Sequence, residues 1–154
     1  MSKVSVKGVL IGGVVDIGTT MALSFPIAIY LISQIDLSHV PKDQVQSLIS
    51  AAMLANRFVF ALQMLAGFAG SLLGGYVAAR VAKHDELLHG TLSCFLCVSM
   101  GIYAVAAGKD SHPPAMQLLM FLESPAAGLF GGYLARLRKP VTPPPVELTP
   151  NAEA

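Results

Sequence analysis

Two carboxylates lie deep inside apolar stretches of this sequence, where charged side chains are rare. Asp16 follows Gly8 by about 12 Å of helix rise, and Glu123 precedes Arg136 by about 20 Å. If these stretches cross a lipid bilayer, both acids fall in its middle part, where an ionised carboxylate is destabilised by several kcal/mol unless it is protonated or paired. The two acids therefore predict either a pathway for a proton or a cation, or hydrogen bonds that hold helices together.

Polar residues close to these acids extend the candidate pathway. Glu123 is followed by Ser124 and Pro125, and a proline inside a helix frees a backbone carbonyl, as in the midplane cation sites of several transporters. Arg57, at the outer end of an apolar stretch, either neutralises an acid or extends its charge to the membrane surface. The candidate residues for an ion or proton pathway are Asp16, Glu123, Arg57, Thr20 and Ser124.

Nothing in the sequence indicates an enzyme. Cys94 and Cys97 form a Cys-x-x-Cys pair inside an apolar stretch that supplies neither further ligands nor positive charge, so we expect small packing residues rather than a redox or zinc site. The histidines, His89 among them, are expected in loops. The sequence also has no phosphate-binding loop, Gly-x-Ser-x-Gly elbow or His-Glu-x-x-His motif. We therefore predict no catalytic residue, no metal and no cofactor.

Four long apolar stretches supply the elements that would position these residues. Of the 154 residues, 54% are hydrophobic and only 12% are charged, which leaves too little polar surface for a compact soluble domain. An apolar helix of about 20 residues spans a bilayer, so the sequence predicts an all-α membrane protein. Its spans are expected at about 8–35, 58–80, 87–108 and 114–137, within a single bundle of residues 1–139 that is followed by a proline-rich, disordered cytoplasmic tail over 140–154.

The placement of lysine and arginine predicts the orientation of these spans. The basic residues are concentrated on one side, which by the positive-inside rule is the cytoplasm. Both termini are then cytoplasmic, and the short basic clusters offer no continuous face for a nucleic acid. The basic residues expected inside are Lys3, Lys7, Arg80, Lys83, Arg136, Arg138 and Lys139, and those expected outside are Lys42, Arg57 and Lys109.

The longest predicted loop, residues 36–57, contains a further helical pattern. The segment Pro41–Asp43 is typical of a helix start, and apolar residues from Val45 to Met53 recur at helical spacing. Residues 42–57 therefore form either an amphipathic helix on the outer membrane surface or an extension of the second span.

Two of the spans end in nearly the same sequence. Ala-Gly-Ser-Leu-Leu-Gly-Gly-Tyr-Val-Ala-Ala-Arg occupies 69–80, and Ala-Gly-Leu-Phe-Gly-Gly-Tyr-Leu-Ala-Arg occupies 127–136. Together with the similar starts Lys7–Leu10 and His89–Leu92, these endings predict two helical hairpins related as parallel repeats.

Small residues recur every three or four positions, so that each span has a small face. In lipid, helices associate by close packing at small side chains rather than by the hydrophobic effect. We therefore expect these faces to pack against each other or against transmembrane helices of a partner. The glycines expected in such packing are Gly8, Gly12, Gly67, Gly70, Gly74, Gly75, Gly90, Gly101, Gly128, Gly131 and Gly132.

The stretch Gly74–Ala82, followed by Leu88-His89-Gly90-Thr91-Leu92, resembles a hairpin found in small four-helix bacterial membrane protein families of unknown function. The resemblance covers a small part of the chain. It implies a bacterial inner-membrane protein without known enzymatic chemistry, and it implies no catalytic residue.

Two classes of function follow from these features. Glycine faces on every span favour a helix-packing protein, either an accessory or assembly subunit or a small homo-oligomer, whose partners are the lipid bilayer and other transmembrane helices. The two acids support an alternative, a small proton- or cation-coupled transport protein. A water-accessible cavity that reaches both carboxylates would favour transport, whereas a dry, fully packed core would favour the packing protein.

Overall fold

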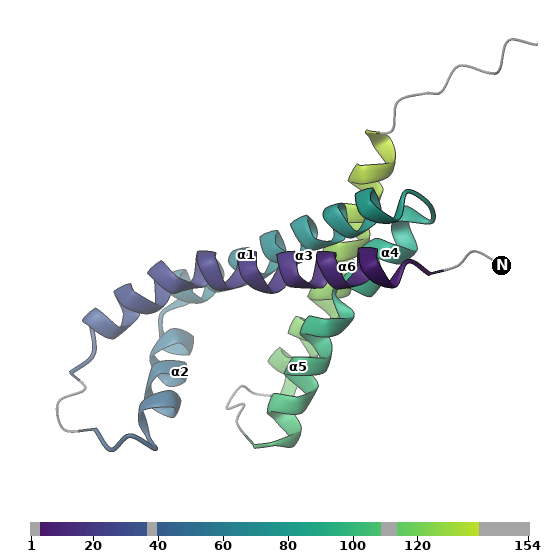
Figure 1. The fold of residues 1–154 in the computed structure, drawn as a ribbon. Coiled ribbons are helices and arrows are strands. Elements are labelled where there is room, and N and C mark those ends of the chain that lie inside the picture. Colours follow the sequence, from purple (N-terminus) through teal and green to yellow (C-terminus); the bar gives the residue numbers. More distant parts are fainter. Residues whose placement is uncertain (1–3, 37–39, 109–113, 139–154) are drawn as a thin grey trace, which may run out of the picture.

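The computed structural model describes residues 4–36, 40–108 and 114–138, and every regular element within these ranges is a helix (Figure 1). Four helices that are long and apolar enough to cross a membrane occupy Val6–Ser33, Arg57–Ala82, Glu86–Ala106 and Met116–Leu137, which confirms that part of the prediction. The predicted tail over 140–154 lies outside the described residues. The elements are α1 (Val6–Ser33), α2 (Val45–Ala55), α3 (Arg57–Ala82), α4 (Glu86–Ser93), α5 (Phe95–Ala106) and α6 (Pro114–Leu137).

Side-chain caps determine where α1 and α3 begin. The Ser5 hydroxyl accepts a hydrogen bond from the Gly8 N–H at 3.2 Å, and the Asn56 side chain accepts from two N–H groups in the first turn of α3. Asn56 itself has an extended backbone (φ −99°, ψ 97°), so it interrupts the chain between α2 and α3. Residues 45–55 therefore form a separate short helix and do not continue the second span.

Two helix pairs make up the fold, and they cross each other. Figure 1 shows α1 running beside α3, and α5 running beside α6 in a different direction. Contacts of α6 with α3 and α4, and of α3 with α4, join the pairs at one end. This closed end contains the start of α1, the end of α3, α4 and the end of α6, while the opposite ends of the pairs diverge (Figure 1). The short helix α2 contacts α1 and α3 at the diverging side, which we call the open end.

Glycines let the helix backbones touch at the closed end. A Cβ atom added at Gly74 would lie 2.7 Å from both the Cβ of Asp16 and the carbonyl oxygen of Gly12, closer than real Cβ contacts. Gly75, the next residue of α3, faces the backbone of Gly128 in α6 in the same way. Two consecutive glycines thus allow α3 to pack closely on two helices at once.

The glycines of α6 are divided between two neighbouring helices. Gly131 faces the carbonyl oxygen of Leu72 in α3, whereas Gly132 faces that of Glu86 in α4. In the sequence repeat Gly131 aligns with Gly74, yet Gly74 faces α1, the other helix of its own hairpin. The two Gly-Gly-Tyr segments therefore occupy different packing positions, and the parallel-repeat relation stays a prediction.

The predicted packing glycines do not all have close neighbours. Gly67 has no described atom within 4 Å of an added Cβ, and the space beside it belongs to a cavity between the helix pairs. Gly101 meets the ring of Phe121 rather than a backbone. Close neighbours surround Gly8, Gly12, Gly70, Gly74, Gly75, Gly90, Gly128, Gly131 and Gly132.

The third span, predicted at 87–108, occupies Glu86–Ala106, and an interruption at Cys94 divides it into α4 and α5. The Ser93 hydroxyl donates to the carbonyl oxygen of Gly90 at 2.8 Å, and the fully buried Cys94 side chain lies against Gly128. A serine hydroxyl that binds the preceding turn favours bending of a helix. The break keeps α4 against α6 and lets α5, which has no buried residue, diverge from α1 and α3.

His89 lies inside α4 and is fully buried, which corrects the expectation of a loop histidine. Its Nε2 atom accepts a hydrogen bond from the Ser5 N–H at 2.8 Å, so Nδ1 carries the hydrogen and donates to the Asp85 carbonyl oxygen at 3.0 Å. Both nitrogens of the neutral ring are thereby satisfied. His89 thus ties the start of α1 to the start of α4 at the closed end.

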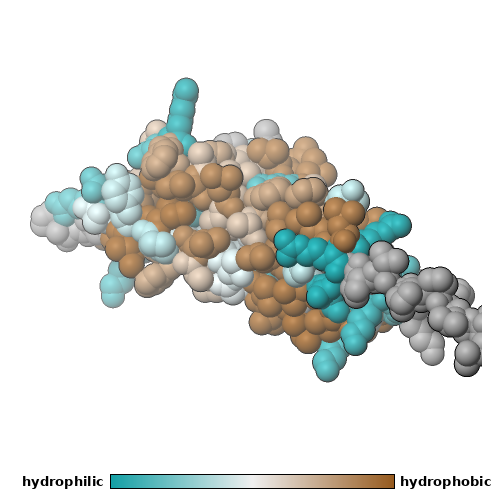
Figure 2. All heavy atoms as spheres, turned by 90° about the horizontal axis from the view of Figure 1, so that it is seen from above, coloured by the Kyte–Doolittle hydropathy of each residue, from teal (hydrophilic) through white to brown (hydrophobic). Residues whose placement is uncertain are grey.

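Large apolar side chains cover the outside of the helices. Figure 2 shows apolar surface over the middle of the molecule and polar residues gathered toward its two ends. Such a surface suits the hydrocarbon region of a membrane, with the polar ends at its two faces. Exposed residues of this kind include Phe25, Phe58, Leu65, Phe95 and Tyr103.

Candidate functional site: a buried carboxyl group and an adjoining cavity

Asp16, in α1, is fully buried and hydrogen-bonded. The Ser71 hydroxyl of α3 donates to it, and lies 3.1 Å from Oδ1 and 3.2 Å from Oδ2. Thr20, one turn further along α1, makes a longer contact of 3.5 Å between its hydroxyl and Oδ1. The carboxyl group is therefore enclosed between α1 and α3, where Gly70 and Gly74 allow these helices to touch.

A short chain of hydroxyl groups connects Asp16 to α6. The Ser71 hydroxyl oxygen lies 3.0 Å from that of Ser124. Because the hydrogen of Ser71 points to Asp16, Ser124 is the donor in this second bond. Ser124 directly follows Glu123, so the chain ends beside the second acid. Hydrogen bonds thus link α1, α3 and α6.

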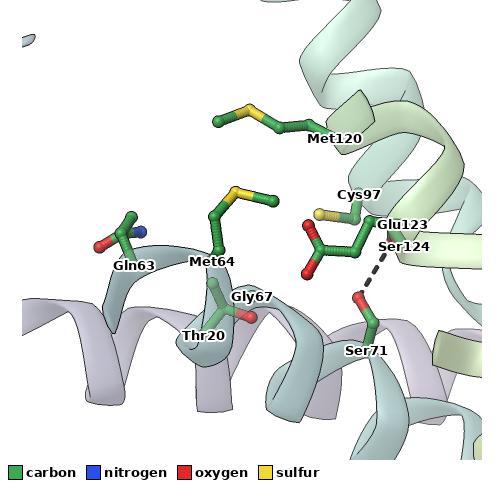
Figure 3. A pocket seen from close by; sticks show the side chains of 9 residues that line it. All are labelled: Thr20, Gln63, Met64, Gly67, Ser71, Cys97, Met120, Glu123 and Ser124. Atoms are coloured by element: carbon green, nitrogen blue, oxygen red, sulfur yellow. Dashed lines mark hydrogen bonds between the residues drawn. The ribbon is translucent and has the colours of Figure 1, made fainter. Parts of the chain in front are cut away.

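A cavity of about 170 Å³ lies where the two helix pairs begin to diverge. Figure 3 shows the Glu123 carboxyl group in this cavity, bordered by Met64, Met120 and Cys97. The walls come from α1, α3, α5 and α6, so both helix pairs contribute to them. The lining residues are Thr20, Gln63, Met64, Gly67, Ser71, Cys97, Met120, Glu123 and Ser124.

Glu123 differs from Asp16 because it has no hydrogen-bond or ion-pair partner among the described residues. Other polar groups of the lining are engaged elsewhere, since Gln63 donates to the Ser24 hydroxyl at 2.9 Å and Ser71 donates to Asp16. An ionised carboxylate without a partner is unstable in apolar surroundings, so this group either holds a proton or needs a cation. Glu123 is therefore the carboxyl group of the site that can exchange a proton for a cation.

The structure brings most of the predicted pathway residues together. Thr20, Ser124 and Glu123 line the cavity, and Asp16 reaches it through its hydrogen bond with Ser71. The cavity thus reaches one carboxyl group directly and the other through one hydroxyl.

Arg57 is not part of this group. It lies 14 positions before Ser71 in α3, or about 21 Å of helix rise away. It is exposed and borders a separate hollow at the open end, together with Tyr30 and Gln34. Within the described ranges, no ion pair joins Arg57 to Asp16 or to Glu123.

Five lining residues were not among the predicted site residues, namely Gln63, Met64, Ser71, Cys97 and Met120. Ser71 follows Gly67 by four positions and precedes Gly74 by three, so it belongs to the small face of α3. That spacing is a signal that identifies it from the sequence. The methionines carry no comparable signal, because methionine fills gaps in any apolar packing.

The two cysteines have different surroundings, and both thiols are free. Cys94 is buried at the helix break, whereas Cys97 lines the cavity. No group of three or more His, Cys, Asp or Glu side chains that could hold a metal ion occurs in the part of the chain that the structure describes.

Over its described residues the chain is a helical protein with four helices suited to a membrane and one carboxyl group that faces the space between the helix pairs. No protein-family model matches the chain, and no curated protein or solved structure is significantly similar to it. The chemistry of the cavity is therefore the basis for a functional proposal.

Proposed function

We propose that the protein is a small proton- or cation-coupled transport protein of the bacterial inner membrane, and that its coupling site is the cavity at Glu123. The hydroxyl chain from Asp16 through Ser71 and Ser124 to the wall of this cavity is the observation that supports the proposal most. If acids served only to hold helices together, both would be enclosed and hydrogen-bonded, as Asp16 is. Glu123 has no described partner and borders a cavity, so the exchange of a proton or a cation explains it better than a role in holding helices together.

The two acids have different roles in this proposal. Asp16, enclosed and hydrogen-bonded, holds α1 against α3 and orients Ser71 and Ser124. Glu123, which faces the cavity, binds a proton or exchanges it for a cation. Entry is from the open end, because the helix backbones touch at the closed end. Release on the other side requires the helix pairs to rock about their glycine contacts, a motion known from other transporters.

Reconstituted vesicles test this proposal. Wild-type protein should give a proton flux that an enclosed pH-sensitive dye detects. Glu123→Gln should abolish it, because an amide keeps the shape of the side chain but cannot cycle a proton. Asp16→Asn should retain most of the flux, because its amide oxygen still accepts from Ser71 and keeps the hydroxyl chain in place. Asp43→Asn, which changes an exposed acid outside the cavity, is the control and should leave the flux unchanged. Equal and negligible flux in wild type and all variants would refute proton-coupled transport.

We further propose that the closed end faces the cytoplasm and that α2 lies on the outer side. The basic residues of the described ranges support this orientation by the positive-inside rule. In intact cells, a membrane-impermeant maleimide should label Lys42→Cys but not Lys83→Cys, in a background without the two native cysteines. The reverse labelling pattern would invert the topology. Described basic residues at the closed end are Lys7, Arg80, Lys83, Arg136 and Arg138, and those at the open end are Lys42 and Arg57.

A helix-packing role is a second candidate, and the low burial of the spans favours it. Between 11% and 33% of the most apolar part of each span is buried. Helices that bury so little against each other leave large faces for further transmembrane helices, as in an accessory or assembly subunit or a small homo-oligomer. Negligible flux in wild-type vesicles, together with a membrane protein that co-purifies in mild detergent, would favour this candidate over transport.

A further inference from the structure

The cavity at Glu123 combines a single acid with soft, apolar walls. Met64 and Met120 contribute thioether groups (Figure 3), and Gly67, which has no side chain, leaves the space beside it open. The hydroxyl chain that leads to Asp16 forms one side. These surroundings suit a ligand with one positive charge and an apolar body.

A metal ion is a poor match for the same groups. Ca²⁺ and Mg²⁺ take about six or more oxygen ligands. Glu123 is the only carboxyl group that lines this cavity, and the described residues contain no group of three or more His, Cys, Asp or Glu side chains that could hold a metal ion. An ammonium ion needs only one counter-charge, and its alkyl groups gain from contact with polarizable thioethers.

The volume of the cavity limits the apolar body of such a ligand. An engineered cavity of roughly 150 Å³ lined by apolar side chains takes up a benzene molecule. The cavity at Glu123 has about 170 Å³. Its ligand therefore carries one ring or one branched chain of that size, with the charged nitrogen beside the carboxylate.

We propose that this cavity binds a monovalent organic cation, an ammonium ion with one small apolar group, through ion pairing with Glu123. On binding, the carboxyl group releases its proton to water and the resulting carboxylate pairs with the nitrogen. The cavity is neutral before and after this exchange, so no unpaired charge is buried at either stage. The inference names a substrate class for the proposed transport function and rests on that function for movement across the membrane, but not for binding.

Isothermal titration of the detergent-purified full chain with benzylammonium tests this inference. We expect one site per chain and release of one proton per bound cation. The affinity should rise with pH by up to about tenfold per unit, because protons compete for the same carboxylate. The neutral analogue ethylbenzene has nearly the same shape without the charge, and it should bind roughly 30-fold more weakly or worse.

Four variants separate the role of the charge from that of the space. Glu123→Gln should weaken cation binding by roughly 30-fold or more, whereas the exposed acid variant Asp43→Asn should not. Gly67→Leu keeps the acid and fills the cavity, since an added Cβ has no described atom within 4 Å. Gly18→Leu is its matched control, because Gly18 has the same open surroundings but does not line the cavity. Both leucine variants should keep the wild-type melting temperature, and only Gly67→Leu should lose binding.

The possible results distinguish this inference from the transport proposal. Unchanged cation binding in Glu123→Gln or in a folded Gly67→Leu variant, or equal binding of the neutral analogue, would overturn the inference. If no organic cation binds while vesicles still show a proton flux that depends on Glu123, the inference fails and the transport proposal stands. If the cation binds as expected but neither it nor a proton crosses the vesicle membrane, the binding site stands and the transport proposal fails.

Discussion

Gly74→Leu and Gly131→Leu should each destabilise the folded chain by about 3 kcal/mol. A Cβ at Gly74 would lie 2.7 Å from the carbonyl oxygen of Gly12, and one at Gly131 would overlap the carbonyl oxygen of Leu72. Both obstacles are backbone atoms, so no side-chain rotation relieves the overlap and the helices must separate. Thermal unfolding in detergent, followed by circular dichroism, measures the loss.

Gly18→Leu is the control for this prediction. It makes the same change inside a helix at a position where no described atom lies within 4 Å of the added Cβ. Leucine favours helix over glycine by a few tenths of a kcal/mol to about 1 kcal/mol, so the melting temperature should stay constant or rise. Unchanged melting temperatures for both Gly74→Leu and Gly131→Leu would show that these faces contact lipid rather than other helices.

Asp16→Ala is expected to destabilise the fold by about 2–4 kcal/mol. The change leaves a cavity in the contact between α1 and α3 and removes the acceptor of the buried Ser71 hydroxyl. Asp16→Asn should alter the free energy of unfolding by less than about 1 kcal/mol, because the amide oxygen still accepts from Ser71. The same thermal unfolding measurement in detergent compares the two variants.

Glu123→Ala provides the matched comparison at the second acid. Glu123 has no partner among the described residues and borders a space that already exists. Its removal should therefore change the free energy of unfolding by less than about 1 kcal/mol. Similar losses for Asp16→Ala and Glu123→Ala would argue against separate roles for the two acids.

The sequence by itself determined the helices and the environment that they suit. Apolar runs of membrane-spanning length are a strong signal, because backbone polar groups in lipid must be satisfied within each segment. Asp16 and Glu123 also stood out, since acids are rare in such runs. Helical spacing of small residues indicated that close packing occurs, and Gly74 and Gly128 are examples where the structure has it. All of these properties are local, so the pattern of residues along a single helix is enough to predict them.

Only the tertiary structure decided which helices meet and what each acid touches. Gly74 and Gly131 are equivalent in the sequence repeat but face different helices. A face of small residues can pack against any other such face, so its sequence does not specify which helix it contacts. Asp16 and Glu123 likewise have similar apolar surroundings in the sequence. The packing of α1 on α3 encloses Asp16 beside Ser71, and the divergence of the two helix pairs leaves Glu123 facing a cavity. That difference depends on contacts between residues far apart in the chain, about which the periodicity within one helix carries no information.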